Sequence, residues 1–311
     1  MKAVRKSGDG IAVVEVPPPE GAGVRVRVRS SGICGSDLHL LRSDFPMAHT
    51  LGHEIAGHTP DGTAVAVEPV TPCGTCPTCR AGDYNLCELG SEMVIGLATD
   101  GGMAEEVLVP ERCLVPLPAG VSPTEACLVE PLAVAIHGLR RARLRGDQRA
   151  VVIGAGSIGL CAVAGVAAAG AEVAVVARHD AQREAAARLG AREIEGSYDL
   201  VIDASGTRSG LARCLELCRP GGTLLLVGSY WDGFELSGME LCLKEITVVP
   251  ASMYGRDGAA RDIDVAASTL ALHPGIADAI ITHRYPLEAA EEAFRTAADR
   301  SAGSIKVVLE P

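Results

Sequence analysis

The chain has 311 residues, of which 48% are hydrophobic, and this is enough sequence for two domains that each bury a core. Its formal net charge of −11 argues against nucleic-acid or membrane-surface partners, because phosphates repel a net-acidic surface. No apolar run reaches the roughly 18 residues of a membrane span, and the first residues lack a signal-peptide pattern. We therefore predict a cytoplasmic protein with neither kind of partner.

The first 130 residues are predicted to form a compact β-rich barrel. Apolar and basic residues alternate over 24–29, and a second short apolar segment covers 63–67. Such alternation is typical of half-buried strands, and Pro and Gly separate the segments from each other. Because aromatic residues make up only 3% of the chain, its cores should be built from Val, Ala and Leu.

Two glycine-containing motifs in this part, 31–39 and 51–54, carry candidate metal ligands. Cys34 and His53 supply a thiolate and an imidazole, and Glu54 or Glu130 can supply the third ligand. A catalytic zinc needs three protein ligands and one open position. Taken singly, Cys34 and His53 would be core residues; together, beside a cysteine lobe and a cofactor fold, they predict a catalytic zinc.

Four cysteines within fifteen residues follow, with the spacing C-x2-C-x2-C-x7-C: Cys73, Cys76, Cys79 and Cys87. Two-residue spacers let a turning backbone aim consecutive thiolates at one tetrahedral zinc. A zinc bound by four thiolates has no position left for water or substrate. The lobe is therefore predicted to be structural, which makes two zinc ions per chain.

From residue 150 the pattern changes to strand, Gly-rich turn, Ala-rich helix and strand, with the strands at 150–153 and 172–176. Further short apolar runs follow at 200–202, 223–227 and 246–249. This order predicts a parallel sheet covered by helices on both faces. After residue 263 come a helix, the segment 279–283, a helix over 289–298 and a last strand at 305–309, and we expect this tail to return to the first domain.

The turn after the first of these strands carries the pattern G-x-G-x-x-G, with Ser157 and Ile158 between its last two glycines. Gly154 permits a tight turn, Gly156 lets the backbone approach a pyrophosphate, and Gly159 allows close packing of the helix. In a strand–turn–helix context this motif predicts dinucleotide binding. Ser205, which follows a later strand, is expected to make a secondary cofactor contact.

The end of the second strand bears on which dinucleotide binds. An acidic residue there would bind the adenine ribose, whereas a basic residue accommodates a 2′-phosphate. The strand ends at Arg178, Arg183 follows one helical turn later, and Asp180 is expected to cap the intervening helix start. These residues favour NADP(H) over NAD(H); the alternative is that Arg178 is an ordinary surface residue.

Several motifs together resemble one family: Gly32–His39, Gly52–Glu54, the four-cysteine lobe, Glu130–Ala133 and Gly154–Gly159. Over nearly its whole length the chain resembles the zinc-dependent medium-chain dehydrogenases/reductases, and in particular their sorbitol and threonine dehydrogenase branch. The segments after His39 and after His58 are shorter than is usual in that family. Both help to wall the substrate pocket, so the resemblance does not carry over a particular substrate.

The resemblance implies an α/β fold: a GroES-like β-rich catalytic domain (1–132), a Rossmann doubly wound parallel-sheet domain (133–263) and a return to the catalytic domain (264–311). It also implies that Cys34, His53 and Glu54 bind zinc, with Glu130 binding zinc or holding its water. Ser36 and His39 match the family's proton relay. Asp37 matches a carboxylate that would orient His53.

The implied activity is hydride transfer between a secondary alcohol (a polyol, sugar, cyclitol or amino alcohol) and NAD(P). The alternative within the same class is an NADPH-dependent ketone or aldehyde reductase. An alternative of another class is a catalytically inactive nucleotide-binding zinc protein. The family further implies a homodimer or homotetramer, and residues 246–249 are a candidate edge strand for its contact.

Overall fold

A computed structural model describes residues 1–8, 10–43, 45, 47–231 and 233–311. The chain folds as two compact units, the first made of Met1–Glu130, Gly255–Ala277 and Ile281–Pro311, and the second of Pro131–Tyr254 and Asp278–Ile280. Contacts thus divide the chain after Glu130 and Tyr254, whereas the sequence prediction divides it after residues 132 and 263. Among the described residues, no helix is long and apolar enough to cross a membrane.

The first unit is built on a mixed sheet of seven strands with the order β15-β16-β3-β4-β5-β7, and β6 also pairs with β3. Its strands are β3 (Val24–Gly32), β4 (Glu54–His58), β5 (Ala64–Val67), β6 (Glu106–Val109), β7 (Leu114–Pro116), β15 (Ile281–Pro286) and β16 (Lys306–Glu310). Within β3, Val26 and Val28 are buried while the arginines that alternate with them, at 25, 27 and 29, are exposed, as the alternation predicts. The cluster around these valines contains only Val, Ile, Leu and Cys among the described residues.

Short elements surround this sheet. The hairpins are β1 (Lys2–Ser7) with β2 (Gly10–Glu15) and β13 (Arg256–Asp257) with β14 (Ala260–Arg261). The helices are α1 (Gly35–Leu40), α2 (Pro77–Ala81), α8 (Asp262–Leu272), α9 (Gly275–Ile280, whose end belongs to the second unit) and α10 (Ala290–Ala298). The 3-10 turns are Tyr84–Leu86, Gly90–Met93, Glu111–Cys113, Ala126–Leu128, Leu287–Ala289 and Arg300–Ala302.

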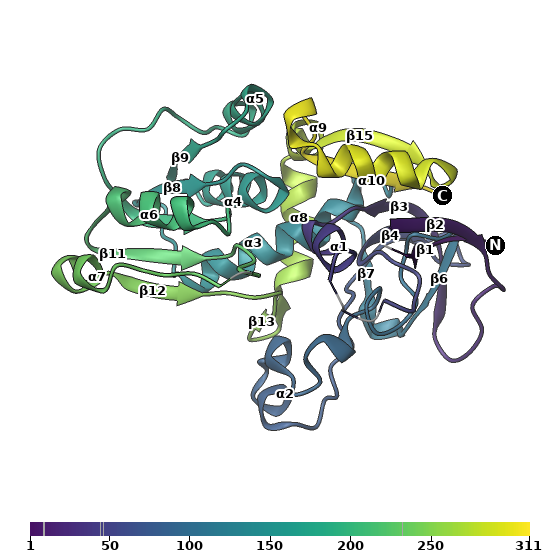
Figure 1. Ribbon diagram of the computed structural model, residues 1–311. Coiled ribbons are helices and arrows are strands. Elements are labelled where there is room, and N and C mark those ends of the chain that lie inside the picture. Colours follow the sequence, from purple (N-terminus) through teal and green to yellow (C-terminus); the bar gives the residue numbers. More distant parts are fainter. Residues whose placement is uncertain (9, 44, 46, 232) are drawn as a thin grey trace. The chain divides into compact units, whose positions relative to one another are not determined.

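The C-terminal tail, Ile281–Pro311, belongs to the first unit. Strand β16 pairs antiparallel with β3, where Val308 lies opposite Gly32, and parallel with β15. Figure 1 shows this yellow end of the chain beside the purple N-terminal strands. All of β16 except its last residue, Glu310, is buried, and Lys306 is the charged residue among these buried positions.

The second unit contains a five-stranded parallel sheet with the order β12-β11-β10-β8-β9, as the βαβ pattern predicts (Figure 1). Its strands are β8 (Arg149–Ile153), β9 (Glu172–Val176), β10 (Tyr198–Asp203), β11 (Cys218–Leu226) and β12 (Thr247–Pro250). Its helices are α3 (Val129–Arg141, which begins in the first unit), α4 (Ser157–Ala168), α5 (Asp180–Arg188), α6 (Arg208–Leu217) and α7 (Gly238–Lys244).

The two edges of this sheet are β12 and β9. Between α5 and β10 the chain makes one isolated bridge, in which Arg192 pairs with Ala174 of β9. No described strand continues the sheet beyond β9. The opposite edge, β12, covers the predicted 246–249 segment within one residue at each end.

Candidate metal and cofactor sites

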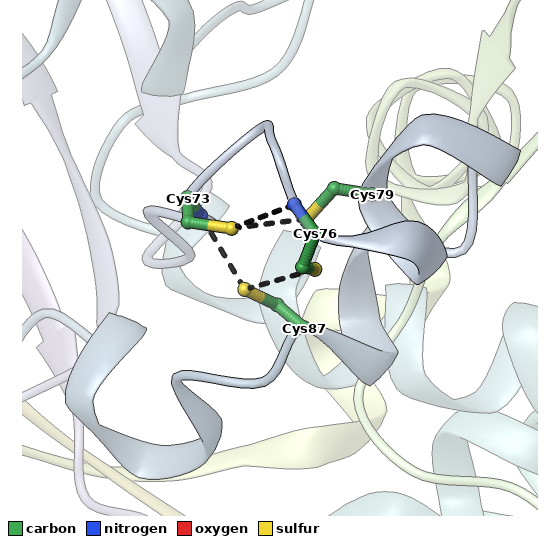
Figure 2. Close-up of side chains that lie close together, drawn as sticks. All are labelled: Cys73, Cys76, Cys79 and Cys87. Carbon is green, nitrogen blue, oxygen red and sulfur yellow. Dashed lines mark hydrogen bonds between the residues drawn. The ribbon is translucent and has the colours of Figure 1, made fainter.

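The four cysteines of the lobe point toward one another, as Figure 2 shows. Their sulfur atoms all lie within 4.8 Å of one another, with 4.0 Å between Cys73 and Cys79 and 3.9 Å between Cys76 and Cys87. Thiolates bound tetrahedrally to zinc at about 2.3 Å would lie about 3.8 Å apart. The spacing and chemistry of these ligands therefore fit one zinc ion.

Hydrogen bonds favour the thiolate at Cys73 and Cys76, whereas burial raises the pKa of Cys79 to about 12. The N–H groups of Thr75 and Cys76 donate to the Cys73 sulfur at 3.4 and 3.3 Å, and these bonds lower the pKa of that thiol. The Thr78 hydroxyl, 3.2 Å from the Cys76 sulfur, and then the backbone N–H groups of Glu88 and Cys79 lower the pKa of Cys76 to about 5. Zinc binds the deprotonated form, so these bonds prepare the lobe for the metal.

The lobe is joined to its surroundings by Tyr84, which lies between the third and fourth cysteines. Its hydroxyl is 2.6 Å from Oε1 of the buried Glu68 and 3.1 Å from the Gly255 carbonyl. Nη1 of Arg261 donates to the other Glu68 oxygen at 2.9 Å. This network, which no sequence pattern indicates, links the lobe to the segment where the chain re-enters the first unit.

A second group of ligand atoms, again within 4.8 Å of one another, belongs to Cys34, His53 and Glu54. Cys34 is the residue before α1, and Glu54 opens β4. Gly52 has a φ of +98°, and a Cβ there would lie 2.7 Å from side-chain atoms of Met103 and Ser31. A larger residue in its place would clash with Met103 and Ser31, which explains the glycine before His53 in this motif.

His53 and Asp37 face each other in the interior. Asp37 is fully buried; its Oδ2 accepts the Cys34 N–H at 3.0 Å, and its Oδ1 lies 3.6 Å from Nδ1 of His53. Oδ1 and Nδ1 have no hydrogen-bond partner among the described residues. Burial lowers the pKa of His53, but the charges of Asp37 and Cys34 outweigh it, so the pKa stands well above its ordinary value.

This arrangement suits a metal-binding histidine. With Nδ1 directed at a carboxylate, the other ring nitrogen is left for a cation, and a carboxylate in that position orients such a ligand. One thiolate, one imidazole and one carboxylate are ligand types that zinc accepts. The chemistry of Cys34, His53 and Glu54 therefore fits a zinc ion with an open fourth position.

Glu54 is also held by a lysine that sequence reasoning missed. Nζ of Lys306 lies 2.6 Å from both Glu54 carboxylate oxygens and donates to the Ile33 carbonyl at 3.1 Å. Each of the two charged side chains is only 1–2% exposed. Burial alone would lower the pKa of Lys306, but the Glu54 charge raises it above its usual value, so the pair is an ion pair. Gly32 makes room for it, because a Cβ there would lie 2.0 Å from Oε2 of Glu54.

The other predicted residues of this site lie around the group. Ser36 and His39 are three positions apart on α1 and therefore on one side of it, and both are half-buried. Glu130 lies in the first turn of α3, and its charge contributes to raising the pKa of His53. Among the described residues, Glu130 is not one of those whose ligand atoms lie within 4.8 Å of one another.

The glycine motif of the second unit has the close contacts that it requires. Gly154 has a φ of +98°, and a Cβ there would lie 2.9 Å from the backbone of Ser205. A Cβ on Gly159 would lie 1.8 Å from the Gly154 carbonyl oxygen. Gly156 is the residue before α4, which begins with Ser157 and Ile158. The backbone thus turns tightly between β8 and α4, where a dinucleotide motif receives a pyrophosphate.

Arg178 and Arg183 differ in the contacts that their side chains make. Arg183 forms an ion pair with Asp180 and donates to the carbonyls of Ala177 and Arg178. Arg178 is exposed, and no described side chain forms an ion pair with it. The prediction that Asp180 caps α5 is wrong: the N-cap is His179, and Asp180 is the first helical residue.

Comparisons with known proteins agree with this architecture. Residues 20–119 match the model of the alcohol dehydrogenase GroES-like domain, and residues 157–268 match the model of zinc-binding dehydrogenases. L-Galactonate-5-dehydrogenase of Escherichia coli (strain K12) is 33% identical over 310 residues, which cover 90% of this chain and 89% of that protein. Galactitol 1-phosphate 5-dehydrogenase of the same strain is 29% identical, with both chains covered completely.

Solved structures share the fold over the whole chain. A structure from Sinorhizobium meliloti 1021, described as a zinc-binding dehydrogenase bound to NADP, has a TM-score of 0.89 and 29% identity, and covers 100% of this chain and 99% of its own. An alcohol dehydrogenase from E. coli CFT073 in complex with NADH has a TM-score of 0.88 and 26% identity, with the same coverage.

The chain therefore belongs to the zinc-dependent medium-chain dehydrogenase/reductase family. Within that family it falls in the sorbitol-dehydrogenase-like branch, and it is a zinc-type, NAD(P)-dependent oxidoreductase. This confirms the resemblance, the fold class and the enzyme class predicted from the sequence.

Proposed function

We propose that the chain transfers a hydride between a secondary alcohol of the polyol or sugar-acid class and NADP(H), using a zinc ion held by Cys34, His53 and Glu54. The observation that carries this proposal is the convergence of those three ligand types within 4.8 Å in the interior of the first unit. A zinc ion held there would supply Lewis-acid chemistry to the alcohol oxygen. The second unit supplies the dinucleotide fold.

The other side chains of the site would transfer the proton, orient His53 and hold water. On α1, the Ser36 hydroxyl would accept the proton that leaves the alcohol, and the His39 imidazole would pass it to water. Asp37 keeps the His53 ring oriented, and Glu130 would hold a water molecule beside the substrate. A polar site of this kind suits a substrate with several hydroxyl groups. Names of the relatives agree with that class: one acts on L-galactonate and another on galactitol 1-phosphate.

A panel of polyols, sugar acids, sugars, cyclitols and amino alcohols, assayed with NAD⁺ and NADP⁺ in parallel, tests the proposed activity. Turnover of a polyol or sugar acid at the highest kcat/KM supports it. Activity restricted to reduction of simple ketones or aldehydes would instead favour the reductase alternative. No turnover together with one bound zinc per chain would favour the inactive nucleotide-binding protein.

The preference for NADP(H) rests on Arg178. Its exposed guanidinium is available for a 2′-phosphate, whereas Arg183 is engaged by Asp180. We expect Arg178→Ala to lower kcat/KM for NADP⁺ about tenfold, because a charge-assisted hydrogen bond contributes about 1.5–3 kcal/mol. The value for NAD⁺ should hardly change. Steady-state kinetics with both cofactors measures this.

Arg183→Ala serves as the matched control. Since Arg183 already pairs with Asp180, its loss should change the NADP⁺ to NAD⁺ ratio less than the loss of Arg178 does. An unchanged cofactor ratio in Arg178→Ala would show that Arg178 does not select the phosphate, and NAD(H) would become the preferred assignment.

We further propose that the chain forms a homodimer through the β12 edge. Leu243 of α7 is 77% exposed and Val248 of β12 is 36% exposed, and β12 is the last strand of its sheet. An exposed apolar edge strand favours pairing with a second copy. We expect Val248→Lys to convert the dimer to monomer in size-exclusion chromatography with light scattering.

The matched control is Val265→Lys. Val265 is a similarly exposed valine on α8 of the other unit, so a lysine there should leave the oligomer intact. A wild-type chain that is monomeric at micromolar concentration, or a Val248→Lys variant that keeps its mass, would contradict the proposed contact. A mass of four chains in the wild type, halved by Val248→Lys, would indicate a tetramer built from such dimers.

A further inference from the structure

The last residue of β10, Asp203, is a fully buried carboxylate that the proposed chemistry does not use. It lies at the carboxyl end of a central strand, with β8 on one side and β11 on the other. In an open parallel sheet, ligands bind outside the carboxyl ends of the strands. A buried charge at this position calls for an explanation, because burying it is costly unless it is hydrogen-bonded.

Four donors from two loops surround the Asp203 carboxylate. Oδ1 accepts the backbone N–H of Ser205 at 3.1 Å and its hydroxyl at 2.6 Å. Oδ2 accepts the N–H of Gly206 at 3.2 Å and the hydroxyl of Tyr230 at 2.6 Å. The first three donors belong to the loop between β10 and α6, and the fourth belongs to the loop after β11. The carboxylate therefore ties these two loops together.

The same loops are in contact through their backbones. The Asp203 carbonyl accepts the N–H groups of Val227 and Gly228 at 3.0 and 2.9 Å. A Cβ on Gly228 would lie 2.7 Å from Gly206 N, and a Cβ on Gly206, whose φ is +62°, would lie 2.5 Å from the Ser229 carbonyl oxygen. There is no room between these loops for an added side chain, so a change in the position of one would move the other.

The first glycine of the dinucleotide motif joins this arrangement. A Cβ on Gly154 would lie 2.9 Å from the Ser205 backbone, which Asp203 holds through two hydrogen bonds. The loops that follow β8, β10 and β11 thus contact one another at the carboxyl ends of these strands. Asp203 is the side chain that links the second and third of them.

Tyr230 is suited to be a permanent donor. Its ring is half-buried and packs against Phe234 with the ring centroids 4.7 Å apart. Burial and the neighbouring Asp203 carboxylate both raise the pKa of the hydroxyl, so it stays protonated and donates at neutral pH. Because Tyr230 lies in the loop after β11, its hydrogen bond to Asp203 attaches that loop to the end of β10.

We propose that Asp203 and Tyr230 are positioning residues that hold the loops after β10 and β11 in the shape that receives the nicotinamide half of the dinucleotide. This inference rests on the proposed function. In a doubly wound sheet the first βαβ half, here β8 and β9, receives the adenine nucleotide, and the second half receives the nicotinamide nucleotide. The loops that Asp203 links are those of the second half.

The experiment compares the whole cofactor with its adenine half. Dissociation constants of NADPH and of adenosine 2′,5′-bisphosphate, and of NADH and AMP, are measured by titration calorimetry for the wild type and Tyr230→Phe. We expect the variant to bind the dinucleotides about tenfold more weakly, the size of one lost hydrogen bond to a charged group. Its affinity for the two adenine fragments should stay within twofold of the wild type. Asp203→Asn, which disturbs more bonds, should show a larger selective loss.

Tyr198→Phe is the matched control. Tyr198 is the first residue of the same strand, and its hydroxyl accepts the Glu195 N–H at 2.9 Å at the opposite end of the sheet. This variant also loses one tyrosine hydroxyl, here from a ring that is more deeply buried than that of Tyr230, so it should lose stability but bind all four ligands as the wild type does.

The outcomes separate the inference from the function on which it rests. Equal weakening of dinucleotides and adenine fragments in Tyr230→Phe, or no weakening of either, would overturn the positioning role while leaving the oxidoreductase intact. A wild-type chain that binds neither dinucleotide would overturn the proposed function and this inference with it.

Discussion

Replacing Cys34 with serine should abolish turnover and lower the zinc content from two ions to one per chain. Cys34 is the only thiolate in the group formed with His53 and Glu54, and a serine hydroxyl is a far weaker zinc ligand. Because loss of a residue that merely supports a zinc ligand costs 10–100-fold, roughly, loss of the ligand should reduce kcat/KM by more than about 100-fold. Elemental analysis of the purified protein and steady-state kinetics measure the two effects.

The controls separate the two zinc groups. Cys242→Ser alters an exposed cysteine of α7 that lies in neither group, so that variant should keep both zinc ions and full activity. The affinity of Cys34→Ser for the dinucleotide should also be unchanged, because Cys34 lies in the first unit and the glycine motif in the second. Retained turnover in Cys34→Ser would remove the catalytic assignment of this cysteine.

Replacing Lys306 with methionine should be among the most destabilising single changes in the first unit. Methionine keeps the length of the side chain but leaves the buried Glu54 carboxylate without its ammonium partner. Breaking a buried ion pair in this way costs about 3–5 kcal/mol. Chemical denaturation of the metal-free protein measures the loss of unfolding free energy. Since the folded pKa of Lys306 is raised above the usual 10.5, the stabilising charge is present at neutral pH and is lost only in alkali above that value.

Two further measurements show what Glu54 does. Adding Glu54→Gln to Lys306→Met removes the uncompensated charge, so the double variant should recover part of the stability. If Glu54 is a zinc ligand, zinc at the Cys34 group should also reduce the penalty of Lys306→Met, because the cation replaces the ammonium. A penalty that is identical with and without zinc would leave Glu130 as the better candidate for the third ligand. A loss below about 1 kcal/mol would contradict the ion pair itself.

Features that depend on neighbouring residues could be predicted from the sequence. Alternation over 24–29 identified β3, because successive side chains of a strand face opposite sides. The βαβ pattern around Gly154 identified the parallel sheet, since such a crossover joins parallel strands. The four-cysteine spacing identified the lobe, because two-residue spacers bring thiols within one metal's reach over a few residues of chain.

Local sequence patterns do not fix the exact ends of helices. The start of α5 was misassigned by one residue, because Asp and His near a helix start offer competing caps and helix ends are not sharply encoded. The five apolar segments predicted at 150–153, 172–176, 200–202, 223–227 and 246–249, by contrast, correspond to the five strands of the second sheet. Arg192 makes only an isolated bridge with β9, and the short segment around it carries no clear strand pattern.

By itself, the sequence determined the class of the protein, its two groups of candidate metal ligands and its dinucleotide motif, because each depends on residues close together in the chain. Only the tertiary structure decided what surrounds them. Lys306 meets Glu54 across 252 positions because β16 returns to pair with β3, and Tyr230 meets Asp203 because β10 and β11 lie side by side. The cost of burying an unpaired charge makes these partners necessary, but only the fold determines which residues they are.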